Sequence, residues 1–175
     1  GRRWLRPVRA VQWAARRIAQ GEHDVQLPIS GNDELNDLAH DIQAIAAIVR
    51  KAPAILVVDA VTSLGVMDLP MDAWGVDIVV AGSQKALMLP PGLAFAALSD
   101  KAWVLVPGAR LPKYYFSFAA ERKAIEKNQS AYTPAVSLVI GLRESLRLIL
   151  AEGLADVFAR HDRLARATRA GVQAL

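Results

Sequence analysis

The stretch Ile-Val-Val-Ala-Gly-Ser-Gln-Lys, residues 78–85, is an apolar run that ends in a glycine, two polar residues and a lysine. A second apolar run, Ile-Leu-Val-Val at residues 55–58, is followed by Asp59. Both runs are continuous rather than alternating, which is typical of strands buried on both faces of a sheet. The spacing between them fits one strand, a crossover and the next strand of a parallel pair. The two runs therefore predict an α/β sheet.

Asp59 and Lys85 each follow the carboxyl end of a predicted strand, which is where open parallel sheets bind ligands. A lysine amine can hold an aldehyde cofactor as an imine, and a carboxylate can keep a proton on a pyridine nitrogen. These are the two side chains that pyridoxal phosphate needs. A single Asp after a strand is more often a turn former, and a single Lys is more often a surface charge, so the prediction depends on their occurring together.

The composition excludes several other kinds of protein. The 175 residues contain no Cys, which excludes disulfides and thiolate metal sites within them and favours a cytoplasmic location. The three His residues have no metal-ligand spacing, so no metal site is expected. The net charge of +4 is modest and the basic residues are scattered, which argues against nucleic-acid binding. No apolar stretch is long enough to span a bilayer, and no secretory signal pattern opens the chain.

After the lysine, the sequence predicts a third strand and two long helices. Residues 93–98 follow a Pro-Pro-Gly turn and form an apolar run. A mixed loop is expected after Asp100, with aromatic residues at 114–118 that pack down or line a channel. A helix opens at Thr133-Pro134, where apolar residues begin to recur at helical spacing. Gly153 interrupts this pattern, and a basic amphipathic helix then runs to the end.

The first third of the chain differs in character, since it predicts two helices with heptad spacing. Pro7 is placed to start the first, and Gly21 to end it. Asn32 or Asp33 can cap the second. Its apolar residues keep the a/d spacing of a coiled coil: Leu35, Leu38, Ile42, Ile45 and Val49.

This arrangement resembles a HAMP domain, the signalling linker of sensor kinases and chemoreceptors. The resemblance covers residues 1–48 and rests on Pro7, on residues 18–22, on Pro28 and on Gly-Asn-Asp-Glu-Leu at residues 31–35. It implies a parallel four-helix homodimer that relays helix motion. The Arg-rich start fits a juxtamembrane position, with any membrane contact made through an upstream segment. An ordinary helical hairpin is the alternative.

The rest of the chain resembles the large domain of class V aminotransferases, the alanine–glyoxylate and serine–glyoxylate group. The matching stretches are residues 57–65, 82–87, 90–92, 132–137 and 142–146. The resemblance implies that Lys85 carries pyridoxal phosphate as an imine and shuttles a proton, and that Asp59 pairs with the pyridinium nitrogen. It also implies that Val61 packs on the face of the cofactor ring.

Further site residues are carried over by the same resemblance. Gln84 and Ser83 would contact the cofactor phosphate. Tyr132 and Thr133 would reach the phosphate bound to the neighbouring subunit, which makes the site a property of a homodimer. An amino acid and an oxo acid are the expected partners.

The expected fold is α/β, a fragment of the fold type I large domain with a mostly parallel sheet, preceded by the HAMP-like coiled-coil segment. We divide the chain into residues 1–41, HAMP-like, and residues 42–175, the aminotransferase fragment, with the start of the small domain at the C-terminal helix. The two resemblances meet inside one helix with no flexible linker, which favours a recombined or engineered chimera. The expected function is transamination of alanine or serine with glyoxylate, with weak activity in an incomplete chain. The alternatives are a dimeric signal-relay module and a chimera without its own activity.

Overall fold

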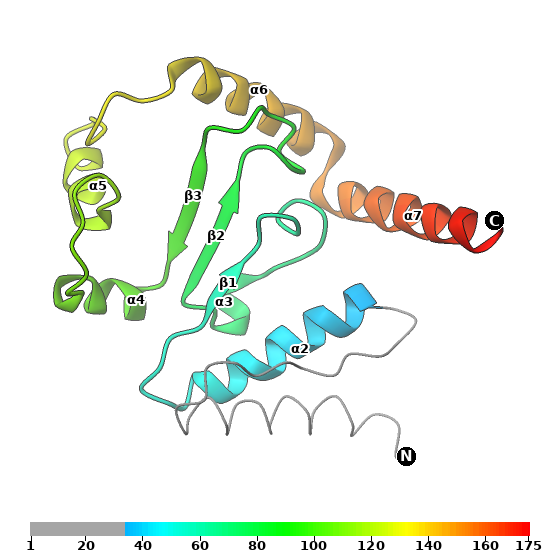
Figure 1. Ribbon diagram of the computed structural model, residues 1–175, viewed down its shortest axis with the longest axis horizontal. Coiled ribbons are helices and arrows are strands. Elements are labelled where there is room, and N and C mark those ends of the chain that lie inside the picture. The colour runs from blue at the N-terminus through cyan, green and yellow to red at the C-terminus, as the bar shows by residue number, and fades with distance from the viewer. Residues whose placement is uncertain (1–33) are drawn as a thin grey trace. The chain divides into compact units, whose positions relative to one another are not determined.

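The computed structural model describes residues 34–175, and the following account concerns those residues. Within them the chain forms two compact units, which we describe separately. One comprises residues 34–56 and 69–76, and the other comprises Val57–Asp68 and Asp77–Leu175. Among the described residues, the first unit is helical and the second combines helices with a sheet (Figure 1). The predicted helix that ends at Gly21 lies outside the described residues.

The first unit contains helix α2, Glu34–Val49, and the short helix α3, Met71–Trp74. Ala46 of α2 is fully buried, and Ile42, Ile45 and Val49 are half-buried. The Arg50 guanidinium donates a hydrogen bond of 3.1 Å to the Ala73 carbonyl, which ties the end of α2 to α3. The predicted apolar stripe is therefore partly buried from Ile42 to Val49, whereas Leu38 is exposed.

The second unit contains a sheet of three strands: β1, Val57–Asp59, β2, Ile78–Gly82, and β3, Ala94–Leu98, in that spatial order. β1 and β2 are parallel, whereas β2 and β3 are antiparallel. The sheet is thus mixed. The β1–β2 pair, which leads to Asp59 and Lys85, is parallel as expected, and the β2–β3 pair is not. The third strand reverses because residues 83–93 lead the chain straight back, without the crossover that a parallel strand requires.

Helix α6, Val136–Glu152, packs on the loop of residues 83–93. The Ser145 hydroxyl donates to the Leu87 carbonyl. Gly141 lies so near Leu89 that a Cβ there would stand 3.1 Å from the leucine methyl. The core cluster consists of Leu87, Leu89, Ile149 of α6 and Val157 of the next helix. Two turns of α6 therefore pack against the loop that follows β2 and hold it in place.

Three short elements occupy the region that was expected to be a mixed loop. They are α4, Asp100–Leu105, the 3-10 turn η1, Val106–Gly108, and α5, Phe118–Ile125. The Ser99 hydroxyl accepts a hydrogen bond of 3.1 Å from the Ala102 amide and caps α4, and Ser117 caps α5 in the same way through Ala120. The expectation of a loop throughout this region is wrong. The two Ser caps were visible in the sequence, but the helices are too short to show a period.

Helix α7, Leu154–Gln173, starts directly after α6, and the predicted interruption at Gly153 is confirmed. The Arg160 guanidinium of α7 donates two hydrogen bonds, of 2.6 and 2.9 Å, to the Glu152 carboxylate of α6. These bonds hold the pKa of the Glu152 carboxyl below its usual value. Among residues 34–175, no helix is both long and apolar enough to cross a membrane.

Candidate functional site

Asp59 and the loop that carries Lys85 lie at the same edge of the sheet. Asp59 is the register partner of Val80, two residues before the end of parallel strand β2. The Ala60 amide continues the pairing with a bond of 2.8 Å to the Val80 carbonyl. Beyond the strands the two chain segments still touch, because a Cβ on Gly65 would stand 3.2 Å from the Ala86 Cβ. The carboxyl ends of β1 and β2 therefore bring both segments together (Figure 1).

The Asp59 carboxylate is exposed, and one of its oxygens is already oriented. Oδ1 accepts a hydrogen bond of 2.9 Å from the Val61 amide, two residues ahead. This is the turn-forming role that a lone Asp after a strand often has. The turn leaves the second oxygen without a hydrogen bond among the described residues. Asp59 can consequently both shape the turn and present an oxygen to a ligand.

Lys85 is exposed at the outer part of a tightly held loop. Its carbonyl accepts a bond of 2.9 Å from the Met88 amide, and Met88 adopts the left-handed conformation with a φ of 59°. Within residues 34–175 the Lys85 amine has neither a hydrogen bond nor an ion pair. The Lys85 amine is accessible to an aldehyde, because no carboxylate among the described residues forms an ion pair with it.

Ser83 is fully buried at the base of this loop. Its hydroxyl donates to the Pro90 carbonyl at 2.8 Å and accepts from the Leu93 amide at 3.2 Å. A serine has one hydroxyl proton, and Ser83 uses that proton in the hydrogen bond to the Pro90 carbonyl. The predicted contact between Ser83 and a phosphate stays a prediction, and what the geometry shows is that Ser83 fastens the two ends of the loop.

The Gln84 side chain folds back over the end of β2. It is exposed, and its Oε1 would lie 2.7 Å from a Cβ at Gly82, so the glycine leaves room for this amide. The carboxamide nitrogen is a hydrogen-bond donor of the kind that phosphate oxygens accept. Gln84 thus lies at the same edge as Asp59 and Lys85, and its contact with a cofactor stays a prediction.

Tyr132 and Thr133 lie on the segment between α5 and α6. The Tyr132 hydroxyl donates to the Tyr114 carbonyl at 2.6 Å, and its ring stacks on Tyr115 with centroids 4.3 Å apart. Thr133 is exposed. The contacts of Tyr132 are with these aromatic residues and not with Asp59 or Lys85, which leaves their predicted role toward a neighbouring subunit as a prediction.

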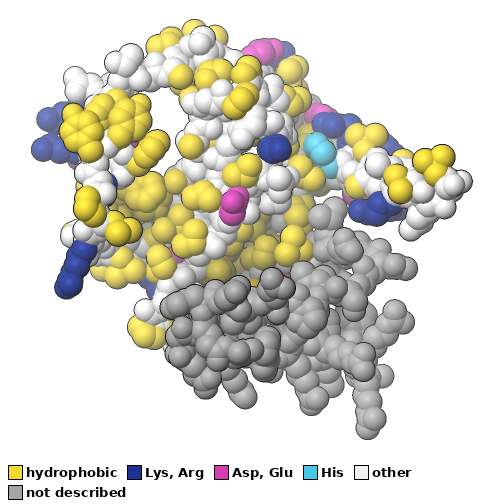
Figure 2. Space-filling model, in the orientation of Figure 1, with side chains coloured by type: hydrophobic (Ala, Val, Ile, Leu, Met, Phe, Trp, Pro, Cys, Tyr) yellow, Lys and Arg dark blue, Asp and Glu magenta, His cyan; other side chains and the backbone are white. Residues whose placement is uncertain are grey.

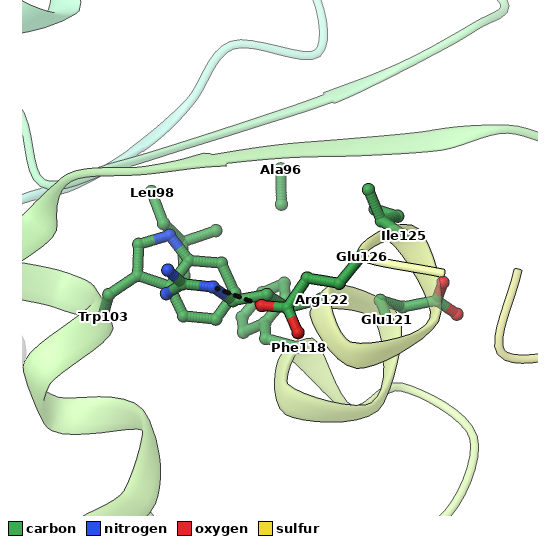
Figure 3. A pocket seen from close by; sticks show the side chains of 8 residues that line it. All are labelled: Ala96, Leu98, Trp103, Phe118, Glu121, Arg122, Ile125 and Glu126. Atoms are coloured by element: carbon green, nitrogen blue, oxygen red, sulfur yellow. Dashed lines mark ion pairs between the residues drawn. The ribbon is translucent and has the colours of Figure 1, made fainter. Parts of the chain in front are cut away.

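A groove with a volume of about 530 Å³ lies beside β3, and Phe118, one of the aromatic residues expected to pack down or line a channel, is among its lining residues. Figure 3 shows the β3 side chains Ala96 and Leu98 pointing toward α5 across this groove. Arg122 lies 4.7 Å from the centre of the Trp103 ring and pairs with Glu126 at 3.7 Å. The lining residues of the groove come from separate stretches of the chain, in and beside β3, α4 and α5, so the groove as a whole has no sequence motif.

Comparison with known proteins identifies the family to which this chain belongs. The family model described as aminotransferase class-V matches residues 31–175. The chain belongs to the class V aminotransferases. Membership in this family implies pyridoxal phosphate as the cofactor, as the resemblance predicted. A second family model, the HAMP domain, matches residues 1–50, so both models include residues 31–50.

Two curated relatives match 98% of this class V chain. One is the L-aspartate–glyoxylate aminotransferase of Paracoccus denitrificans, 42% identical, and the other is named as the soluble hydrogenase 42 kDa subunit of Anabaena cylindrica, 40% identical. The chain spans 44% and 45% of their lengths. These 175 residues contain no Cys. Residues 34–175 also contain no cluster of three acidic, His or Cys side chains that could hold a metal.

Solved structures of class V enzymes share the fold. The pyridoxamine–pyruvate aminotransferase of Mesorhizobium loti is 38% identical and superimposes with a TM-score of 0.70, over 75% of this chain and 34% of that one. The expected fold, a fragment of the fold type I large domain, is thereby confirmed.

The residues at the sheet edge fit the cofactor that the family implies. Pyridoxal phosphate requires an amine for its aldehyde and a carboxylate for its pyridine nitrogen. Lys85 supplies an amine without a partner among the described residues, and Asp59 supplies an exposed carboxylate oxygen. Gln84 adds a donor at the same edge. The donor set therefore matches the chemistry of the group.

Proposed function

We propose that the protein containing this chain is a pyridoxal-phosphate-dependent aminotransferase that moves an amino group from alanine or serine to glyoxylate or a similar oxo acid. The carrying observation is that Lys85, without a partner among residues 34–175, stands on a fastened loop at the same sheet edge as Asp59. The name of the Paracoccus denitrificans relative supports glyoxylate as the acceptor. The proposal concerns the whole protein, since the chain spans less than half of that relative.

Each residue at the edge has a distinct part in this proposal. When bound, pyridoxal phosphate supplies an aldehyde and a ring that accepts electrons. Asp59 keeps a proton on the ring nitrogen, and the Val61 amide keeps the Asp59 carboxylate in one orientation. Lys85 would hold the cofactor through its aldehyde, and its Nζ would carry a proton to and from the substrate carbon. Gln84 donates to the phosphate, and the Val61 side chain flanks the ring.

The proposal includes a homodimer, in which Tyr132 and Thr133 of one subunit reach the phosphate held by the other. The stack of Tyr132 on Tyr115, together with the bond to the Tyr114 carbonyl, fixes the backbone that precedes Thr133. The exposed Thr133 hydroxyl is available as a donor on that fixed segment.

Reduction with borohydride tests cofactor binding directly. The chain is mixed with pyridoxal phosphate, reduced, digested and examined by mass spectrometry. The peptide that contains Lys85 is expected to carry a pyridoxyl group, which Lys85→Ala abolishes. Lys113 is the control, because its amine is held by the Ala109 and Leu111 carbonyls at 2.8 and 3.3 Å. Equal labelling of Lys113 and Lys85 would contradict a specific site.

A dimeric signal-relay module is the second candidate, and the HAMP match over residues 1–50 favours it. In this function the coiled-coil helices transmit motion, and the aminotransferase part follows as a passenger. Such a module would work beside the cytoplasmic face of a membrane, in keeping with the Arg-rich start of the chain.

A further inference from the structure

The loop that carries Lys85 is closed by two backbone hydrogen bonds, one inside the other. The Met88 amide donates to the Lys85 carbonyl at 2.9 Å, and the Leu89 amide donates to the Ser83 carbonyl at 3.1 Å. Lys85 is therefore the first residue of a β-turn, and a larger ring encloses this turn. Met88 lies at the end of the turn, so its backbone torsions set the direction in which the Leu89 amide points.

Met88 has a backbone conformation that residues with a side chain seldom adopt. Its φ is 59°, and among residues 34–175 the other residue besides glycine with a positive φ is Asn128, at 56°. Asparagine tolerates this left-handed region because its short polar side chain can form local hydrogen bonds, whereas the Cβ of other residues comes too close to a carbonyl oxygen. The conformation of Met88 is therefore strained.

The packing of its two neighbours keeps Met88 in this conformation. Leu87 and Leu89 belong to the core cluster and are each 9% exposed, whereas Met88 between them is 57% exposed. The Leu87 carbonyl also accepts the hydrogen bond from Ser145 of α6. Strained residues persist where the surrounding structure leaves no alternative, and they cluster at functional sites. Since the Met88 side chain is largely exposed, the feature that the fold maintains here is the backbone conformation.

The position of the Lys85 amine depends on this backbone. Lys85 is exposed, and within the described part of the chain its amine has neither a hydrogen bond nor an ion pair. Figure 2 shows few charged side chains, among hydrophobic and uncharged ones, over the carboxyl ends of β1 and β2. Side-chain partners among residues 34–175 therefore do not hold the amine, and the loop backbone alone directs it.

We propose that Met88 is a positioning residue for Lys85, which acts through its left-handed backbone and not through its thioether. The strained torsion aims the Leu89 amide at the Ser83 carbonyl and so fixes the backbone from which the Lys85 amine reaches an aldehyde. That this aldehyde is pyridoxal phosphate rests on the proposed function, whereas the closure of the ring does not. Tolerance of positive φ at position 88, and not hydrophobicity or size, then decides how well Lys85 reacts.

Substitutions at position 88 separate the backbone from the side chain. Met88→Gly and Met88→Asn remove the thioether and tolerate positive φ, whereas Met88→Ile keeps an apolar side chain of similar volume but is β-branched and strongly disfavoured in this region. Asn128→Ile is the matched control, because it places the same residue at the other left-handed position, outside the Lys85 loop. Thermal unfolding shows which variants are folded, and Met88→Ala replaces Met88→Ile if the latter is not.

Hydrogen exchange at the Leu89 amide measures closure of the ring without a cofactor. Exchange is expected to stay slow in Met88→Gly, Met88→Asn and Asn128→Ile, and to accelerate by about tenfold or more in Met88→Ile because of the strain at positive φ. Borohydride trapping with pyridoxal phosphate then compares Lys85 with Lys113. The first three variants are expected to keep the preference for Lys85, and Met88→Ile is expected to lower its labelling to that of Lys113. Met88→Ala is expected to lie between these limits.

The proposal is overturned if Met88→Asn opens the ring and loses Lys85 labelling as far as Met88→Ile does, because the thioether would then be the part that matters. Unchanged exchange at Leu89 in the β-branched variant, or in Met88→Ala where it is used instead, overturns it as well. Equal labelling of Lys85 and Lys113 in the unsubstituted chain contradicts the proposed cofactor site instead. Exchange at Leu89 still decides the role of Met88 in that case.

Discussion

The Ser83 hydroxyl shows how one side chain fixes the position of the lysine two residues later. It joins the Pro90 carbonyl to the Leu93 amide and is fully buried between them. The Leu93 amide belongs to a half-buried residue, so losing this partner costs free energy. A residue that resembles a ligand contact in sequence can therefore be needed for the shape of the loop that holds the ligand.

Removing this hydroxyl with Ser83→Ala should lower the free energy of unfolding by about 0.5–1.5 kcal/mol, because it removes the hydrogen bond to the half-buried Leu93 amide. Urea denaturation measures the change. Ser137→Ala is the matched control, since Ser137 is exposed and makes no hydrogen bond through its side chain among the described residues. Equal stability of the two variants would contradict the structural role of Ser83.

At the scale of elements, Gly153 decides where α6 ends and α7 begins. Its φ of 91° and ψ of 133° are rare for residues with a side chain, and its amide and carbonyl bond to Ile149 and Val157 at 3.0 Å each. The Glu152–Arg160 pair spans the same junction but is exposed, so its contribution is small and falls with added salt. The backbone conformation of Gly153, more than the ion pair, sets the junction.

Replacing Gly153 and Gly171 with alanine should therefore change the free energy of unfolding in opposite directions. Gly153→Ala is expected to lower the free energy of unfolding by about 1–3 kcal/mol because of strain at positive φ. Gly171→Ala lies inside α7 with open space around its Cβ and should raise the free energy of unfolding by about 0.5–1 kcal/mol. Thermal or urea unfolding of both variants measures this, and a loss of similar size in each would contradict the assignment.

The elements differ in how far the sequence could predict them. The strands at residues 57–59 and 78–82 are short apolar runs that end in polar residues, and α6 has a clear helical period. α4 and α5 are too short for periodicity, and only their Ser caps marked them. At the site, the shared edge of Asp59 and Lys85 followed from parallel pairing. The commitment of Ser83 to the loop could not be predicted, because it depends on the tertiary positions of Pro90 and Leu93.

Residues 31–50, which include α2, match both the aminotransferase and the HAMP family models. Two curated relatives align with 98% of the chain. An amphipathic helix can satisfy either reading, since a stripe of spacing three and four packs on a partner helix or on a domain. The predicted division at residue 41 and the chimera hypothesis stay predictions, because both depend on this shared helix.

Charge placed on the α2 stripe distinguishes the two readings. If α2 forms a HAMP-type coiled coil, Ile42→Asp combined with Ile45→Asp should convert a dimer to a monomer, since each carboxylate would enter the helix interface. Light scattering after size-exclusion chromatography measures the mass. Gln43→Asp is the control, because Gln43 is exposed on the same helix. An unchanged mass of the double variant would exclude α2 as the dimer contact.

The bond from Ser145 to the Leu87 carbonyl joins residues 58 positions apart in the chain. During synthesis on the ribosome, the strands and Lys85 emerge well before the helix that holds the lysine loop. Until α6 has left the exit tunnel and docked, the loop is closed by the hydrogen bonds of Ser83 but lacks the bond from Ser145. The packing of the loop that carries Lys85 is thus completed only after residues 136–149 have been translated.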